Sequence, residues 1–290
     1  MYFIISLLVG VFVSIMIAIN GDLAVRYGLH TSSVIIHTAG FLFISAAVLI
    51  KREKPFSVRH PWYFYTAGAV GVATVAFNNY AFGRISLSAL LAIVLLGQSV
   101  IGLAFDQYGW LGLPKNPFRK HRIIGLVLMI AGIAVMIDRF DTFAVILSFL
   151  AGGCIVFTRT LSASLAERSS IRISTFFNYV VGLTAAVIVF LLLGGNEPSL
   201  LETGFSTEVY IYLGGIIGAC LILTCNLIVM KVSAFYLSLL LFIGQVFAGV
   251  IIDAIIDRSF SARILIGGVL VTLGLCTDML LDKKIMGKVE

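Results

Sequence analysis

Two glutamines at matching places in the chain are the side chains best suited to hold a polar ligand. Gln98 and Gln245 each follow a glycine, and each lies near the middle of a long apolar run. A carboxamide in a hydrocarbon layer costs a few kcal/mol unless it is hydrogen-bonded, and its partner can be a neighbouring helix or a bound substrate. We therefore expect these glutamines either to bind substrate or to join helices, and their recurrence at one depth favours the binding site.

The other polar residues of the apolar runs form two sets, one near each surface of the membrane. One set lies near the outer ends of the first three runs: Asn20, His37 and Asn79. The other lies near the inner ends of the sixth, seventh and eighth runs: Arg159, Ser162, Asn178, Tyr179 and Asn226. We expect a contribution to substrate binding from Asn79, Asn226 and Arg159. We expect gating or coupling roles for Asn20, His37, Ser162, Asn178 and Tyr179. The alternative is that these side chains simply meet headgroups at helix ends.

Two of these residues carry specific expectations. His37 is the one histidine inside an apolar run, and an imidazole is a natural proton carrier near neutral pH, although a lone histidine can also be structural. An arginine that faces a cavity favours an anionic group on the substrate. Near a helix end, however, the side chain of Arg159 can instead reach the membrane surface.

The sequence lacks the patterns of an enzyme or a metal site. The four cysteines lie within apolar runs and none is near a histidine in sequence. No phosphate loop, nucleophile motif or close acid–base pair is present. Asp106 and Asp253 end apolar runs, where we expect pairing with loop cations such as Lys231 or Arg122; the alternative is that they attract a cationic substrate at the mouth. We therefore expect no enzyme activity, no metal and no cofactor.

The composition places these residues in a membrane protein. Of 290 residues, 60% are hydrophobic even without glycine and 12% are charged, against roughly 45–50% apolar with glycine included and 25% charged in a soluble domain. This balance excludes a disordered chain, a nucleic-acid-binding protein and a secreted disulfide scaffold. Runs of about 20 apolar residues can each cross a bilayer as a helix. They predict ten spans: 2–20, 32–50, 63–82, 85–105, 122–138, 143–165, 172–193, 209–229, 234–253 and 262–281.

The basic residues predict how the spans are oriented. Fourteen lysines and arginines flank one side of the predicted spans and five flank the other. By the positive-inside rule, both termini are then cytoplasmic. The net charge of +6 therefore indicates membrane orientation and contact with anionic lipids.

The sequence also repeats within itself. An offset of 142 residues pairs Gly40 with Gly182, and an offset of 147 residues pairs the two glutamines with each other. These matches predict an all-α integral membrane protein with two five-helix halves, residues 1–140 and 141–290. Because five is odd, the halves must be inverted, an architecture typical of secondary transporters with a site near the midplane.

Three groups of residues carry a resemblance to a known family. They are Asn20-Gly21-x-Leu23-Ala24-x-Arg26-x-Gly28 after the first span, Gly97-Gln98 in the fourth, and Asp106 with Tyr108-Gly109 beyond it. Here the chain resembles a fused pair of YdcZ-type units of the drug/metabolite transporter superfamily. The resemblance implies a central cavity lined by the first four spans of each half, with the fifth at the periphery. Met16 and Thr158 stand where it predicts a glutamine, and Ser162 where Asn20 should repeat.

The sequence thus predicts a bacterial-type inner-membrane secondary transporter that moves a small polar metabolite or drug-like compound by alternating access. Its expected partners are that small molecule and membrane lipids, with a homodimer as a further state and no nucleic acid. The alternatives are an exporter of amphipathic compounds, a lipid-carrier flippase, or a non-transporting membrane subunit that stabilises or recruits a partner.

Overall fold

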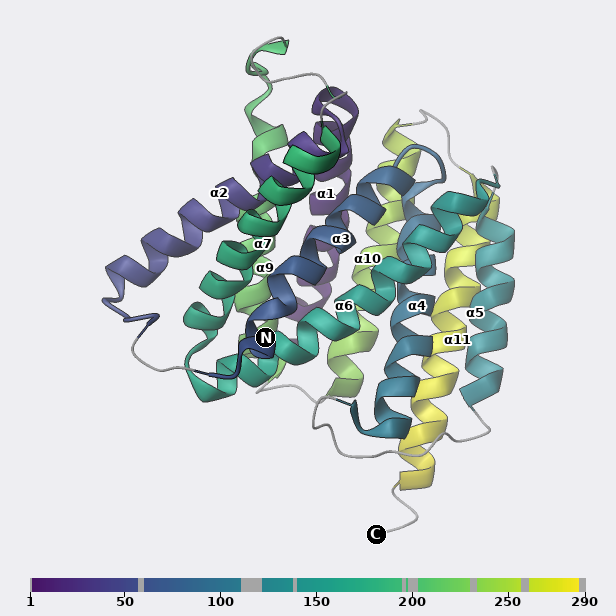
Figure 1. The fold of residues 1–290 in the computed structure, drawn as a ribbon. Helices are drawn as coiled ribbons and strands as arrows, with labels where there is room; N and C mark the ends of the chain where they lie inside the picture. The colour runs from purple at the N-terminus through teal and green to yellow at the C-terminus, as the bar shows by residue number, and fades with distance from the viewer. Residues whose placement is uncertain are drawn as a thin grey trace. The chain divides into compact units, whose positions relative to one another are not determined.

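The structure is a computed structural model that describes residues 2–56, 60–110, 122–137, 140–194, 197, 203–229, 234–256 and 261–286. Every element in these ranges is a helix (Figure 1). The α-helices are α1 (Tyr2–Tyr27), α2 (Leu29–Ile50), α3 (Ala67–Ala81), α4 (Leu87–Tyr108), α5 (Arg122–Met136), α6 (Thr142–Arg168), α7 (Ile171–Leu193), α9 (Gly214–Val229), α10 (Ala234–Ile256) and α11 (Ala262–Met286). Two 3₁₀ helices, η1 (Trp62–Thr66) and η4 (Val209–Tyr212), precede α3 and α9.

Each predicted span coincides with one of these α-helices, so the helical prediction is confirmed. By length and composition, α1, α2, α4, α6 and α7 are able to cross a membrane, and shorter apolar helices accompany them. The crossing of all ten spans and the cytoplasmic placement of the termini stay predictions.

Local signals set the helix ends. Ser86 caps α4, because its side chain accepts a hydrogen bond from the backbone N–H of Ala89. Gly109 ends the same helix in the left-handed conformation, with φ of 66°. Gly28 separates α1 from α2 with φ of 86°, a conformation that other residues rarely adopt.

The chain forms two compact units, each with segments from both halves of the sequence. Unit 1 comprises Met1–Ile15, Gly83–Gly153 and Ile228–Glu290, and unit 2 comprises Met16–Phe82 and Cys154–Leu227. Unit 1 therefore holds α4, α5, α10 and α11, and unit 2 holds α2, α3, α7 and most of α9. Both α1 and α6 contribute to each unit. The division into repeats near residue 140 stays a prediction about the sequence.

In unit 1, glycines let α4 and α6 cross with their backbones in contact. A Cβ atom at Gly97 would lie 2.1 Å from the carbonyl oxygen of Phe149, and one at Gly152 would lie 2.1 Å from that of Val94. Small residues allow such close approach where lipid removes the hydrophobic drive for association. This crossing therefore requires glycine on both helices.

An equivalent crossing joins α10 to α1. A Cβ atom at Gly244 would lie 2.2 Å from the carbonyl oxygen of Leu7, and one at Gly10 would lie 2.1 Å from that of Leu241. Adding 147 to the α4 residue numbers and subtracting 142 from the α6 residue numbers gives the residues of this second crossing. The repeat seen in the sequence therefore extends to the packing.

Unit 2 contains a second equivalent pair of crossings. A Cβ atom at Gly68 of α3 would lie 2.1 Å from the carbonyl oxygen of Asn178 in α7. A Cβ atom at Gly215 of α9 would lie 2.0 Å from the carbonyl oxygen of Ile36 in α2. The same two offsets relate these contacts.

Equivalent helices also pack directly on each other. In unit 2, α2 and α7 are antiparallel, because His37 contacts Gly182 whereas the later residue Gly40 contacts the earlier residue Tyr179.

In unit 1, α5 and α11 run side by side (Figure 1). Gly125 contacts Gly274 whereas Gly132 contacts Gly267, so these two helices are antiparallel as well.

Candidate functional site

His37 and Tyr179 meet where α2 crosses α7. Their ring centroids lie 6.0 Å apart. His37 donates through Nδ1 to the backbone oxygen of Ser33 at 2.8 Å, and the Tyr179 hydroxyl donates to the backbone oxygen of Gly215 at 3.0 Å. The sequence analysis placed these two residues near opposite surfaces. His37 and Tyr179 are equivalent positions, because the offset of 142 residues relates them. They meet because the equivalent helices α2 and α7 cross at these positions.

A second group of buried polar side chains lies at one end of unit 2, which we call the Asn20 end. The Asn79 side chain donates through Nδ2 to the Ser32 hydroxyl at 3.3 Å, which joins α3 to α2. Asn20 is buried against Gly214, the first residue of α9. Its Oδ1 atom has no hydrogen-bond partner.

At the opposite end of unit 2, which we call the Ser162 end, polar side chains of α6 and α7 are joined by hydrogen bonds. Asn178 donates through Nδ2 to the Ser162 hydroxyl at 3.1 Å, and the Ser174 hydroxyl donates to the Ser162 backbone oxygen at 2.6 Å. These bonds tie α6 to α7. Ser162 and Asn178 thus contact each other, as their common place near the inner ends of two spans suggested.

Arg159 lies one turn before Ser162 on α6, and its side chain is exposed. Asn226 is part of α9, but its side chain lies outside the described part of the chain. The contribution of both residues to substrate binding stays a prediction.

The two glutamines belong to unit 1, on α4 and α10. Gln245 is buried. The Ser14 hydroxyl donates a hydrogen bond to its backbone oxygen at 2.8 Å, so the side-chain carboxamide takes no part in this bond. Gln98 is half-buried. The two helices pack together, with Gly249 of α10 against Ser88 of α4. A role for the glutamines in substrate binding stays a prediction.

Asp253 has a role that the sequence analysis missed. Its carboxylate accepts hydrogen bonds from the backbone N–H groups of Leu87 and Ser88, at 2.7 and 2.8 Å, and from the Ser88 hydroxyl. The carboxylate near the end of α10 thus faces the positive end of the α4 dipole. Asp106, its equivalent, pairs with Arg122 at 4.0 Å. Lys231, the other expected partner, lies outside the described residues.

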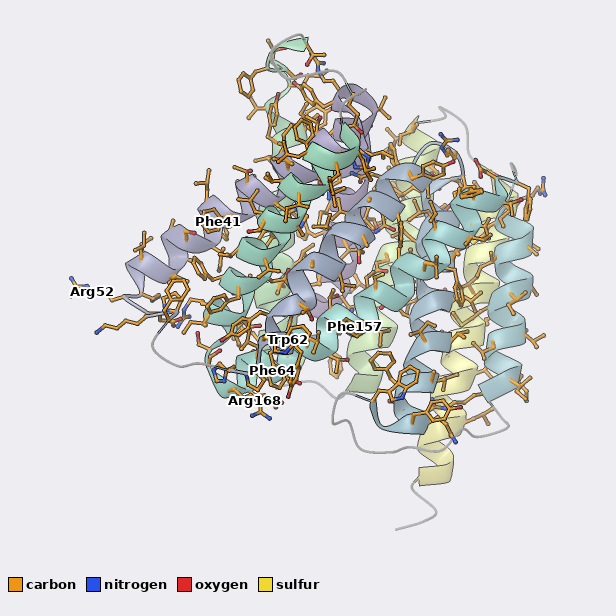
Figure 2. All side chains as sticks on the ribbon, viewed as in Figure 1. Phe41, Arg52, Trp62, Phe64, Phe157 and Arg168 are labelled. Carbon is orange, nitrogen blue, oxygen red and sulfur yellow. The ribbon has the colours of Figure 1, made fainter. Side chains whose placement is uncertain are left out.

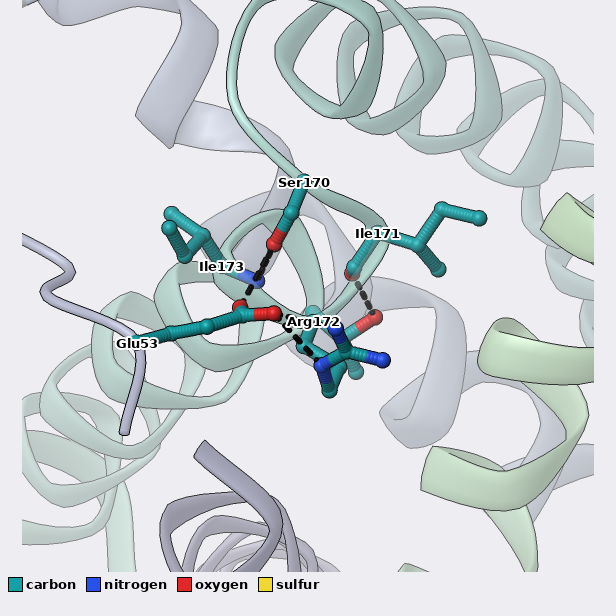
Figure 3. Close-up of polar contacts among 6 residues, drawn as sticks. Glu53, Ser170, Ile171, Arg172 and Ile173 are labelled. Carbon is teal, nitrogen blue, oxygen red and sulfur yellow. Dashed lines mark hydrogen bonds and ion pairs between the residues drawn. The ribbon is translucent and has the colours of Figure 1, made fainter. Parts of the chain in front are cut away.

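A second missed contact closes the Ser162 end. Glu53, beyond α2, accepts a hydrogen bond from the Ser170 hydroxyl and one from Arg172 Nε, each at 2.7 Å (Figure 3). A second Arg172 nitrogen also contacts this carboxylate. Burial tends to raise the pKa of Glu53, but the hydrogen bonds from Ser170 and Arg172, with the arginine charge, outweigh it and lower the pKa below its ordinary value.

A reciprocal contact closes the Asn20 end. Glu197, beyond α7, accepts hydrogen bonds from the backbone N–H groups of His30, at 2.9 and 3.0 Å, and Thr31, at 2.8 Å, in the first turn of α2. Each of the paired helices α2 and α7 is thus bound at its N-terminal end by a glutamate that follows the other. No sequence spacing pairs a loop carboxylate with a particular helix terminus, so no signal pointed to either glutamate.

Aromatic residues fix α6 against η1 at the Ser162 end. Phe64 is buried with Leu161 and Leu165, and Phe157 packs against this cluster. The guanidinium of Arg168 lies 4.9 Å from the centre of the Phe64 ring, and Figure 2 shows these side chains together. This packing holds the part of α6 that carries Ser162.

No group of three or more histidine, cysteine, aspartate or glutamate residues that could hold a metal ion occurs among the residues that the structure describes. The buried polar groups of the described residues are instead mostly amides and hydroxyls, together with the imidazole of His37, the phenols of Tyr27 and Tyr179 and the carboxylate of Asp253. Such groups can bind and orient a polar molecule.

Comparison with known proteins places the chain in a family. Residues 1–135 and residues 143–277 both match the family described as "Putative inner membrane exporter, YdcZ". The chain belongs to this YdcZ family of the drug/metabolite transporter superfamily. Because the match occurs once in each half, the chain is a fused member with two family units. That description names an exporter of the inner membrane and no enzymatic activity.

One solved structure, described only as a crystal structure of a protein, also resembles the chain. It aligns with a TM-score of 0.63 at 17% sequence identity, over 97% of this chain and 96% of its own. This likeness shows the fold alone. No curated protein matches the chain.

Proposed function

We propose that this YdcZ family member is a secondary transporter of the cytoplasmic membrane, which moves a small polar metabolite by alternating access between two inverted five-helix halves. Membership of an exporter family supports transport. The observation that supports the inverted arrangement is the antiparallel packing of equivalent helices, α2 on α7 and α5 on α11. Two copies that run in opposite senses through a bilayer can open the same site to either side in turn.

In this proposal all ten α-helices span the membrane and both termini are cytoplasmic. The basic residues then place the Asn20 end of unit 2 outside and the Ser162 end inside. The hydrogen bond from Asn178 to Ser162 must break when the inner mouth opens, because it joins α6 to α7. Asn20, at the outer mouth, serves as the corresponding gate.

The substrate site in this proposal comprises Gln98, Gln245, Asn79, Asn226 and Arg159. Amide groups can donate and accept hydrogen bonds, so they suit a polar metabolite. His37 and Tyr179 lie between the two mouths, where a change in contact between α2 and α7 couples one mouth to the other.

The test begins with the purified protein. A thermal-unfolding screen against a panel of polar metabolites at pH 6 and pH 8 identifies compounds that stabilise the protein by mass action. Uptake of the best compound is then measured in proteoliposomes.

The double variant Gln98→Leu with Gln245→Leu should lose uptake while it still folds. The control variant is Thr277→Val, because the hydroxyl of Thr277 on α11 donates only to its own helix, at the backbone oxygen of Leu273. Normal uptake by the double variant would refute the glutamine site. Absence of uptake for every stabilising compound would refute transport itself and favour a non-transporting membrane subunit.

A further inference from the structure

Glu53 and Glu197 contact equivalent positions of the repeat. Glu53, beyond α2, accepts a hydrogen bond from Arg172 in the first turn of α7 (Figure 3). Glu197, beyond α7, accepts bonds from the backbone N–H of His30 in the first turn of α2. The offset of 142 residues makes His30 the counterpart of Arg172. We call these contacts the Glu53 clasp (Glu53, Ser170 and Arg172) and the Glu197 clasp (Glu197, His30 and Thr31).

A second pair of counterparts, Ser170 and Gly28, shows the same equivalence. The Ser170 hydroxyl donates to Glu53 at 2.7 Å. Gly28 lies directly against the Glu197 carboxylate, because a Cβ atom there would be 2.4 Å from its Cδ atom. The glycine leaves room for this carboxylate to reach the backbone of α2. The two clasps are thus two versions of one contact, and they lie at opposite ends of unit 2 because α2 and α7 are antiparallel.

The two helices touch each other midway between the clasps. Gly40 lies midway along α2 and contacts Tyr179, and Gly182 lies midway along α7 and contacts His37. Rocking of one helix about this central contact separates the pair at one end and brings it together at the other. Each clasp is therefore placed where it opposes one direction of such a motion.

The clasps differ in their donors. The Glu53 clasp is an ion pair, because Arg172 is charged. The Glu197 clasp uses the hydroxyl of Thr31 and backbone N–H groups of the first turn of α2, which have no partner within their own helix. A glutamine at either position keeps the shape of the side chain but replaces one accepting oxygen with a donor and removes the charge. Glutamine variants therefore loosen each clasp selectively.

We propose that the Glu53 and Glu197 clasps are the two locks of unit 2, and that release of one lock while the other holds determines which mouth opens. Release of the Glu53 clasp opens the Ser162 end, and release of the Glu197 clasp opens the Asn20 end. The clasps are contacts within the fold, whereas their place in a transport cycle rests on the proposed function.

Two buried serines, Ser32 and Ser174, can report which end is open. They are counterparts by the same offset, each lies in the first turn of its helix, and they are 0% and 2% exposed, respectively. In full-length protein whose native cysteines are replaced with alanine, Ser32→Cys and Ser174→Cys are made separately. The rate at which each thiol reacts with a water-soluble maleimide is measured on the purified protein. A buried thiol reacts only while its end is open, so the rate measures the population of that open state.

Glu53→Gln should raise the labelling rate at position 174 about tenfold, as expected for the loss of a charge-assisted hydrogen bond, and should not raise the rate at position 32. Glu197→Gln should have the opposite effect. Glu167→Gln is the matched control, because Glu167 is an exposed carboxylate near the end of α6, and it should change neither rate. An equal increase at both positions would overturn the proposal, because it would indicate general loosening of the fold. Unchanged rates in both glutamine variants would overturn it as well.

An exchange of charges separates a lock from a general loss of stability. Glu53→Arg combined with Arg172→Glu restores the ion pair in reverse, so it should return the labelling rate at position 174 toward the wild-type value. Lack of recovery would overturn the Glu53 clasp as an ionic lock. Opposite labelling changes without uptake of any compound in proteoliposomes would refute the proposed function and leave the clasps in place. Uptake with unchanged labelling would refute the clasps alone.

Discussion

The crossing of α4 and α6 gives the sharpest test of the packing. Replacing Gly97 with alanine puts a methyl carbon 2.1 Å from the backbone oxygen of Phe149. Ordinary contact begins at 3.4 Å, so the two helices must separate by about 1.3 Å or bend locally. The obstacle is backbone on the facing helix, which cannot rotate away as a side chain could.

Gly102, on the same helix, is the matched control, because a Cβ atom there meets nothing within 4 Å. Overpacking of this kind costs about 1–3 kcal/mol, so Gly97→Ala should destabilise the protein by at least that much. Gly102→Ala should instead stabilise it by about 0.5–1 kcal/mol, because alanine loses less conformational entropy than glycine in a helix. The two substitutions are chemically identical, and only the tertiary contact gives them opposite signs.

The assay is thermal unfolding of the purified protein in detergent, in which each kcal/mol shifts the melting temperature by about 2–4 °C. Gly244→Ala should behave like Gly97→Ala, since a Cβ atom there would lie 2.2 Å from the Leu7 backbone oxygen. Similar shifts for Gly97→Ala and Gly102→Ala would refute the close crossing. A loss at Gly97 without one at Gly244 would refute the repetition of the contact.

Three further predictions follow from contacts at the helix ends. Gly28→Ala should lower the free energy of unfolding by about 1–2 kcal/mol, because φ at this position is 86° and the new methyl group would meet Glu197. Denaturant unfolding measures this loss. Asp253→Asn should cost about 1–3 kcal/mol, because one amide oxygen cannot replace a carboxylate that accepts from the N–H groups of Leu87 and Ser88. Hydrogen exchange at those two N–H groups should become faster. Unchanged exchange would contradict the contact. Glu53 has a lowered pKa in the folded protein, so its contribution to stability is present above its ordinary value of 4.5 and is lost as pH falls through the lower folded value. Melting temperatures across that acidic range should therefore fall less steeply for Glu53→Gln than for the wild type, and parallel curves would argue against the ion pair.

The sequence predicted the helices correctly because their signals are local. Composition and the length of the apolar runs indicate helices that can cross a bilayer, and glycine and serine mark several of their ends. The internal offsets also came from the sequence alone, and the equivalent glycine crossings repeat with those offsets. The family followed from a few short motifs, which the match in both halves supports.

The contacts between helices could not be predicted in the same way. Position along a span gives the approximate depth of a residue, but it does not say which helix that residue faces. His37 and Tyr179 were therefore assigned to opposite mouths, although antiparallel packing of α2 on α7 brings their rings to 6.0 Å. The roles of Asp253, Glu53 and Glu197 depend in the same way on which helix terminus each carboxylate meets.

Hydropathy, repetition and short motifs are properties of the order of residues, so they identify this chain as a duplicated, helical membrane protein of the YdcZ family. Which polar atoms have hydrogen-bond partners depends instead on the folded arrangement of the helices. That distinction depends on distances between helices that are far apart in sequence, so Ser162 has a partner whereas Asn20 Oδ1, its counterpart by the repeat, has none.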